Sequence, residues 1–254
     1  MESGPLLFAR FAYPPNALGY CGPDGSGELL ERTASADGGQ DMRRLARGFE
    51  GAWPYLELIA HENGLGDPLD PRVVEAYWIG NGLLDRVRGP AFRGSLEDRF
   101  RPRVGRVVDH VLDPVAGGGV PHHSFHVFGV FPWVGLLRGG VVDEPLRVLD
   151  RCRIRWARVD AVVGDRAVVR SRPLEWRDGR LLLGAPAVEE VTVAEAGRSL
   201  TAGLAPGDLV ACHWDWVCTR ITLAQAAELR RRTAQVLAAV QPVRVPTAYT
   251  SSSP

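Results

Sequence analysis

A change of pattern near residue 149 constrains this chain more than any other feature. Before it, apolar residues recur at helical spacing between Gly- and Pro-rich breaks, as from Leu45 to Ile59. After it, short β-branched runs alternate with turn signals such as Gly164-Asp165. Helices followed by strands indicate an α+β fold. We therefore expect three parts: a mainly helical domain at 1–148, a small β-barrel domain with a C-terminal helix at 149–242, and a flexible tail at 243–254.

Local signals sharpen both halves. The helical pattern over residues 40–63 is interrupted at Pro54, and another candidate helix begins at Pro71, a residue that suits the first helical turn. A third helix is expected over residues 96–112. Near the C-terminus, Thr222 and Gln225 form a capping-box signature, which predicts a helix to about Val240.

Composition excludes several classes of function. The chain has 30 basic and 30 acidic residues, and every basic one is arginine. Without lysine there is no Schiff-base chemistry and no P-loop. The arginines are not clustered as in a nucleic-acid-binding protein. No apolar run approaches the roughly 18 residues of a membrane span. The N-terminal sequence lacks a signal-peptide pattern, so we expect a cytoplasmic protein.

Four scattered cysteines, Cys21, Cys152, Cys212 and Cys218, do not make a disulfide framework. As reduced thiols they are available to bind metal. On a strand, Cys212 and His213 point to opposite faces, so we expect Cys212 in the core and His213 outside it. Asp215 would then orient His213 as a ligand. Cys218 lies in no recognisable motif.

Two segments of the C-terminal half carry a family resemblance. The first runs from Cys152 to Val159 and continues with Val162–Val169; the second runs from Leu204 to His213 and continues to Glu228. Their order and spacing resemble the HypC/HupF family, the small chaperones of nickel–iron hydrogenase maturation, across residues 152–240. The resemblance implies an OB-like β-barrel with a C-terminal helix. It also places the family's iron-binding cysteine on Cys152 and its strand-end histidine on His213.

The chain departs from that family in two ways. Cys152 is internal rather than at a processed N-terminus, and Trp156-Ala157 replaces a Pro-Gly turn. The proposed chemistry is still reasonable, because thiolate and imidazole both suit an iron centre. Arg151, Arg153 and Arg155 would lower the pKa of Cys152 and attract an anionic iron–cyanide fragment. Alternatively, these arginines form the solvated face of a strand.

The sharpest feature of the first half is the histidine-rich segment 122–126. On a helix, His122 and His126 would share one face; on a strand, His122, Ser124 and His126 would line one side. Either arrangement can bind a transition metal with a third ligand, for which the candidates are Cys21, His61, His110 or a carboxylate. The alternative is two solvent-facing histidines and one packed among aromatic residues.

The N-terminal half resembles an uncharacterised bacterial family associated with hydrogenase gene clusters. Together the resemblances imply an assembly chaperone with no catalytic residues. It would take an iron–cyanide–carbonyl fragment transiently on Cys152 and His213. Its expected partners are an iron–sulfur maturation scaffold protein and the hydrogenase large-subunit precursor. The helical domain would supply partner specificity or bind a second transition metal.

Two other classes of function stay open. One is a metal-dependent hydrolase or oxidoreductase whose site includes Cys21, His122 and His126 in the N-terminal domain. The other is a metal-free module in which the barrel docks a partner.

Overall fold

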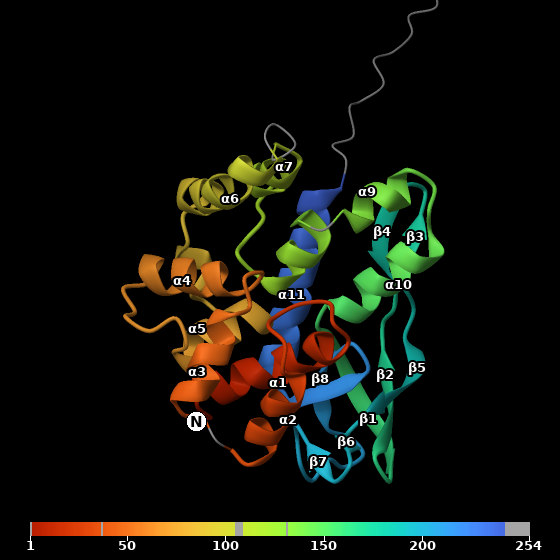
Figure 1. The fold of residues 1–254 in the computed structure, drawn as a ribbon. Coiled ribbons are helices and arrows are strands. Elements are labelled where there is room, and N and C mark those ends of the chain that lie inside the picture. Colours follow the sequence, from red (N-terminus) through yellow and green to blue (C-terminus); the bar gives the residue numbers. More distant parts are fainter. Residues whose placement is uncertain (1, 37, 105–108, 131, 242–254) are drawn as a thin grey trace, which may run out of the picture.

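A computed structural model describes residues 2–36, 38–104, 109–130 and 132–241, so the predicted tail lies outside the described residues. The α+β organisation is confirmed, with helices first, then strands, then one long helix (Figure 1). No helix in these ranges is long and apolar enough to cross a membrane.

The helices of the first part are short and joined by tight turns. In chain order they are α1 (Gly4–Ala17), α2 (Ser26–Ala34), α3 (Gln40–Arg47), α4 (Trp53–Glu62), α5 (Pro71–Trp78), the 3-10 turn η1 (Leu84–Arg86), α6 (Gly89–Val104), α7 (Asp109–Ala116), α8 (His123–Phe125), the π-helical turn η3 (His126–Val130), α9 (Trp133–Arg138) and α10 (Asp143–Cys152). The break expected near Pro54 is confirmed, because α3 and α4 are separate helices.

The second part begins at Arg155. Its elements are β1 (Arg155–Val163), β2 (Arg166–Ser171), β3 (Leu174–Arg177), β4 (Arg180–Leu183), β5 (Ala187–Thr192), β6 (Ala194–Glu195), β7 (Arg198–Ser199), β8 (Leu209–His213), β9 (Trp216–Arg220) and α11 (Leu223–Val240). The hairpin at Gly164-Asp165 is confirmed by the pairing of Val163 with Arg166. The capping box is also confirmed, since Thr222 and Gln225 hydrogen-bond each other's backbone.

Five strands pair in the order β1-β2-β5-β9-β8, and β8 pairs back with β1, so the pairings form a ring. All are antiparallel except β5 with β9, which meet at Thr192 and Trp216. Small buried residues fill the inside of the ring: Ala157, Val159, Ala167, Val169, Val191, Val193, Val210, Cys212 and Val217. The expectation that Cys212 belongs to the core is confirmed.

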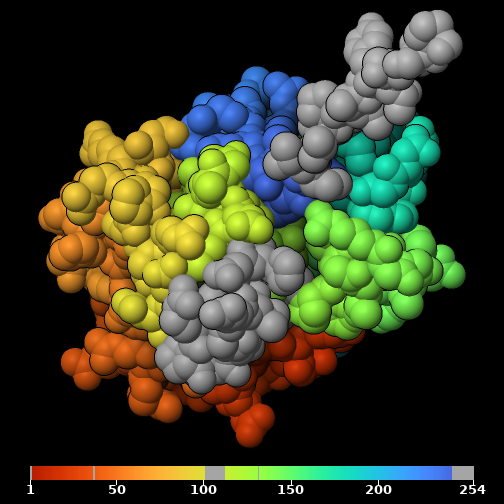
Figure 2. Space-filling model, turned by 90° about the horizontal axis from the view of Figure 1, so that it is seen from above, coloured from red at the N-terminus to blue at the C-terminus, as the bar shows by residue number. Residues whose placement is uncertain are grey.

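A second and larger core joins the helices to the outside of the ring. It includes Phe8 and Phe11 of α1, Ala211 of β8, Trp216 of β9 and Leu229 of α11. Helix α11 runs through the middle of the molecule in Figure 1, where it contacts α7, α8, β1 and β8, and in Figure 2 its blue surface lies between the yellow helices and the teal strands. Helix α10 continues across the predicted boundary at residue 148 and ends at Cys152.

Helix α1 lies at the centre of this arrangement, packed on α2, α3, α5 and the strands β8 and β9. It is buried along most of its length although it contains Pro14 and Pro15. Prolines inside a helix remove backbone donors and normally end it. The sequence pattern therefore gave no expectation of this helix. Here both prolines fall in its last turn, so the loss is limited to the bonds that the carbonyls of Arg10 and Phe11 would have accepted.

Candidate metal centre

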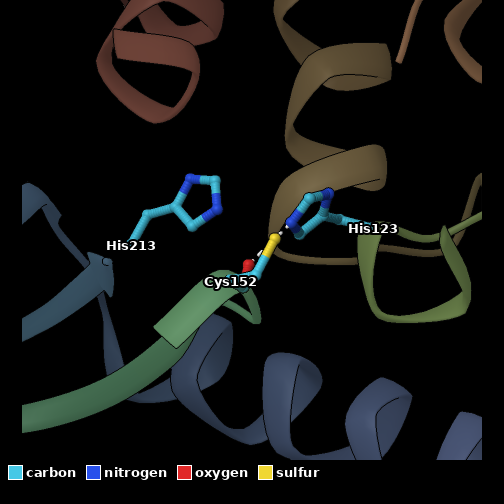
Figure 3. A group of neighbouring side chains, drawn as sticks. All are labelled: His123, Cys152 and His213. Carbon is cyan, nitrogen blue, oxygen red and sulfur yellow. Dashed lines mark hydrogen bonds between the residues drawn. The ribbon is translucent and has the colours of Figure 1, made fainter. Parts of the chain in front are cut away.

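Three side chains from distant parts of the chain converge where the helices meet the ring. The ligand atoms of His123, Cys152 and His213 all lie within 4.8 Å of one another. His123 begins α8, Cys152 ends α10, and His213 ends β8 (Figure 3). One thiol and two imidazoles at this separation are a donor set for a transition metal such as zinc or iron.

His213 is held by helix α1. Its Nδ1 lies 2.6 Å from the carbonyl oxygen of Phe11, and since a carbonyl only accepts, Nδ1 carries the proton. Within α1 that carbonyl would bond to the backbone of residue 14 or 15, but both are prolines with no N–H. The prolines thus free the carbonyl for His213. Holding the proton on Nδ1 leaves a lone pair on Nε2, which is the form a metal requires.

The Nε2 atom of His213 is buried and has no hydrogen-bond partner among the described residues. Burial holds the pKa of His213 well below its usual range, so the ring is neutral. The expectation that Asp215 orients this histidine is wrong. Asp215 instead pairs with Arg151 at 3.1 Å. The turn at Trp214 and Asp215 carries the carboxylate away, while His213 points back toward α1.

Cys152 ends a helix rather than lying on a strand, and it is half-buried. Burial, followed by the charge of Cys21, raises the pKa of its thiol well above the usual range. The expectation that neighbouring arginines lower this pKa is therefore wrong. The thiol is protonated when metal is absent, and binding a metal would release that proton.

The alternative, a solvated arginine face, is wrong as well, since Arg153 and Arg155 are both 1% exposed. Arg155 donates to Glu189 at 3.1 Å and to the backbone carbonyls of Arg151 and Trp214. It therefore ties the residue before Cys152 to the residue after His213. Arg155 thus fixes the two candidate ligands relative to each other, and Arg153 is held by Asp150 and the carbonyl of Arg172.

His123 is hydrogen-bonded on both sides. Its Nε2 lies 2.9 Å from the carbonyl oxygen of Cys152, drawn as a dashed line in Figure 3, and its Nδ1 lies 3.3 Å from the hydroxyl of Tyr77. Burial lowers the pKa of His123 to about 4, so it too is neutral. Metal ligation through Nε2 would replace the hydrogen bond to Cys152 and move the imidazole proton to Nδ1, facing Tyr77.

Residues 122–126 adopt neither of the two expected arrangements, a shared helical face or one side of a strand. His122 precedes α8 and caps it by accepting from the amide of Ser124 at 3.1 Å. His122 therefore has an extended backbone outside the helix, so its four-residue spacing to His126 does not place the two side chains on one helical face. His123 and His126 line the cavity described next, whereas His122 does not.

The triad opens into a cavity of about 320 Å³. Its walls are mostly apolar and include Trp78, Trp133 and Trp214, with His126 and Cys21 also in the lining. The ring of His126 lies 3.4 Å from the hydroxyl of Tyr55. The structure thus brings four of the five predicted metal residues to one cavity: Cys21, His126, Cys152 and His213.

The remaining histidines lie elsewhere. His122 is fully buried behind α8, and burial lowers its pKa to about 3. His61 is exposed on α4. The side chain of His110 lies outside the described residues. Sequence reasoning missed His123 as a ligand because both regular spacings began at His122.

The arrangement can bind one metal ion through a thiolate and two imidazoles and leave at least one coordination position open to the cavity. An open position permits an added ligand or a substrate, whereas a structural site is closed.

Comparisons place the chain in a family without assigning it a chemistry. No curated protein matches it, and no solved structure does. One family description matches residues 1–246, so it spans the helices and the strand ring together. The chain therefore belongs to the family of unknown function DUF6390.

Proposed function

We propose that this protein binds a transition metal through His123, Cys152 and His213 and carries an iron fragment in the assembly of a nickel–iron hydrogenase. The observation that carries the proposal is the meeting of these three side chains within 4.8 Å beside a cavity of about 320 Å³. A bare ion needs far less room. The cavity leaves space for the diatomic ligands of an iron–cyanide–carbonyl fragment.

The resemblance to hydrogenase chaperones supports the choice of cargo. It singled out Cys152 and His213 from their order in the sequence, and these two residues are neighbours in space. The ring of five strands followed by α11 agrees with the OB-like barrel and C-terminal helix of that family. We accordingly assign the ring as an OB-like barrel.

The donor set suits a carrier. A cargo held by three side chains and exposed to a cavity keeps open positions through which a recipient can take it. The imidazoles are neutral and only the thiol must lose a proton, so apparent affinity should rise about tenfold per pH unit below the thiol pKa. The expected donor is an iron–sulfur maturation scaffold protein, and the expected recipient is the hydrogenase large-subunit precursor.

The test is infrared spectroscopy of protein purified without oxygen after co-production with hydrogenase maturation proteins. We expect cyanide and carbonyl bands in the wild type, none in Cys152→Ala, and unchanged bands in Cys212→Ala, whose thiol lies inside the ring. If the wild type shows no bands where a known chaperone loads fully, the hydrogenase assignment is wrong. If metal analysis is also empty, a metal-free docking module is favoured instead.

A second candidate is a metal-dependent enzyme in the same cavity. It is favoured by His126, which lies beside the triad with its Nδ1 3.4 Å from Tyr55 and could move a proton near a bound metal. In that case His126→Ala abolishes turnover of a metal-activated substrate while stoichiometric metal is retained. Equal turnover by the variant would exclude this role.

A further inference from the structure

Cys21 reaches the cavity from a segment that belongs to neither the ring nor the triad. It lies in the loop 18–25 between α1 and α2 and contributes to the cavity lining with His123, Cys152 and His213. Its sulfur is not one of the three ligand atoms of His123, Cys152 and His213 that lie within 4.8 Å of one another. Of the four cysteines it is the exposed one. Its position is therefore between the triad and solvent.

Three contacts hold this loop in place. The side-chain amide of Asn16 donates to the carbonyls of Cys21 at 2.8 Å and Pro23 at 2.7 Å. Tyr20 stacks on Trp214 with ring centroids 4.3 Å apart, which joins the loop to the residue after His213.

The third contact is at Gly22, whose φ of +87° few other residues adopt. A Cβ there would lie 2.3 Å from the ring of Phe49, so the loop needs glycine to pack against this cavity wall. An anchored loop of this kind fixes where the sulfur of Cys21 can lie.

Cys21 lines the cavity although the residue as a whole is exposed. Burial raises the pKa of the Cys21 thiol to about 12. Cys21 and Cys152 line the same cavity, and Tyr20, the neighbour of Cys21, stacks on Trp214, the neighbour of His213. A second thiol beside a metal-binding triad is the group that a transition metal prefers as an additional ligand.

We propose that Cys21 is the ligand through which metal enters and leaves the triad. This inference rests on metal binding by the triad and adds a route to it. On the way out, a bond forms from Cys21 Sγ to the metal as the thiol proton passes to solvent. The bond from the metal to His123 Nε2 breaks, the imidazole proton returns from Nδ1 to Nε2, and the neutral His123 regains its hydrogen bond to the Cys152 carbonyl. The oxidation state of the metal does not change.

The test uses the full chain and Co²⁺, whose thiolate absorption reports binding. Stopped-flow mixing measures loading with Co²⁺ and removal by excess EDTA. We expect Cys21→Ser and Cys21→Ala to slow both processes about tenfold, with the equilibrium dissociation constant within about twofold of wild type. The matched control is Leu18→Ala, an exposed residue of the same loop that does not line the cavity. It should exchange metal at the wild-type rate.

Three results would overturn the inference. Unchanged exchange rates in both Cys21 variants would mean that metal bypasses this thiol. An equilibrium affinity that falls as far as the rates would make Cys21 a permanent ligand. If the wild type binds no Co²⁺ at all, triad binding itself fails, and this result is distinguishable because it appears before any variant is examined.

Discussion

Strand β8 has two faces with opposite chemistry. One face turns into the ring, where Val210 and Cys212 pack among valines and alanines. The other turns toward the helices, where Ala211 joins the larger core and His213 reaches the triad. Adjacent residues of one strand therefore lie in a well-filled apolar core and at a cavity of about 320 Å³.

The two regions differ in whether they contain buried polar side-chain atoms that lack a hydrogen-bond partner. Inside the ring, the filling residues bring no side-chain nitrogen or oxygen that needs a partner. Around the cavity, the described residues include His213 Nε2, Trp78 Nε1 and Trp214 Nε1, all buried without a partner. Each such atom costs about 1–3 kcal/mol. The ring is thus a scaffold, and the unsatisfied groups at its outer surface mark where a ligand belongs.

The largest expected consequence of this contrast is acid sensitivity. Burial lowers the pKa of His122 to about 3, of His123 to about 4 and of His126 to about 3, and it holds that of His213 well below its usual range. In the unfolded chain their pKa is about 6.5. Stability is therefore complete above pH 6.5 and is lost as pH falls toward 4, because the unfolded state binds more protons.

Each such histidine contributes a slope of about 1.4 kcal/mol per pH unit, so four give between about 5 and 6 kcal/mol per unit. Urea unfolding of metal-free protein between pH 6 and pH 5, below the unfolded pKa and above the folded ones, measures this slope. His122→Gln should lower the slope by about a quarter, while His61→Gln, at an exposed position, should leave it unchanged. An equal slope in both variants would contradict the assignment.

The second prediction compares the substitution of Cys152 with that of Cys212. Cys152→Ala removes a ligand and should weaken metal binding more than the 10–100-fold typical of losing a ligand's supporting contact. Cys212→Ala should leave metal affinity unchanged but lower the free energy of unfolding by about 1–2 kcal/mol, because it empties part of the ring core. Calorimetric metal titration measures the affinity of both variants, and urea unfolding measures their stability. The reverse pattern would place the site inside the ring.

The smallest predicted effect concerns the helix that orients His213. Pro15→Ala supplies an N–H for the Phe11 carbonyl, which then has less capacity to hold the proton of His213 Nδ1. We expect metal affinity to fall about tenfold while stability is unchanged or rises, since alanine favours helix. In the control, Pro14→Ala, the new N–H faces the carbonyl of Arg10. If both variants bind alike, the prolines do not act through Phe11.

The sequence-based predictions agree best with the structure where neighbouring residues determine the local conformation. The turn at Gly164-Asp165, the break at Pro54 and the capping box at Thr222 are set by neighbouring residues, so the pattern predicted them. The alternation of Cys212 and His213 along β8 followed from strand geometry. The expectation that His213 lies outside the core is wrong, because helix α1 covers that face and His213 is fully buried.

The rest depends on distant contacts. Arg153 and Arg155 are buried because Asp150 and Glu189 lie beside them, and Glu189 comes from another strand. Helix α1 forms despite its prolines because packing on both sides stabilises it. His123 escaped prediction because both regular spacings began at His122, which instead caps α8 from outside the helix. The convergence of His123 with Cys152 and His213 is likewise a tertiary result.

The central claim is that one metal is held by His123, Cys152 and His213. X-ray absorption spectroscopy of the protein loaded with one equivalent of Zn²⁺ tests it most directly. The account predicts one sulfur ligand at about 2.3 Å and two imidazole nitrogens at about 2.0 Å, with the sulfur absent in Cys152→Ala. A first shell of oxygen atoms alone, or a sulfur that persists in Cys152→Ala, would contradict it.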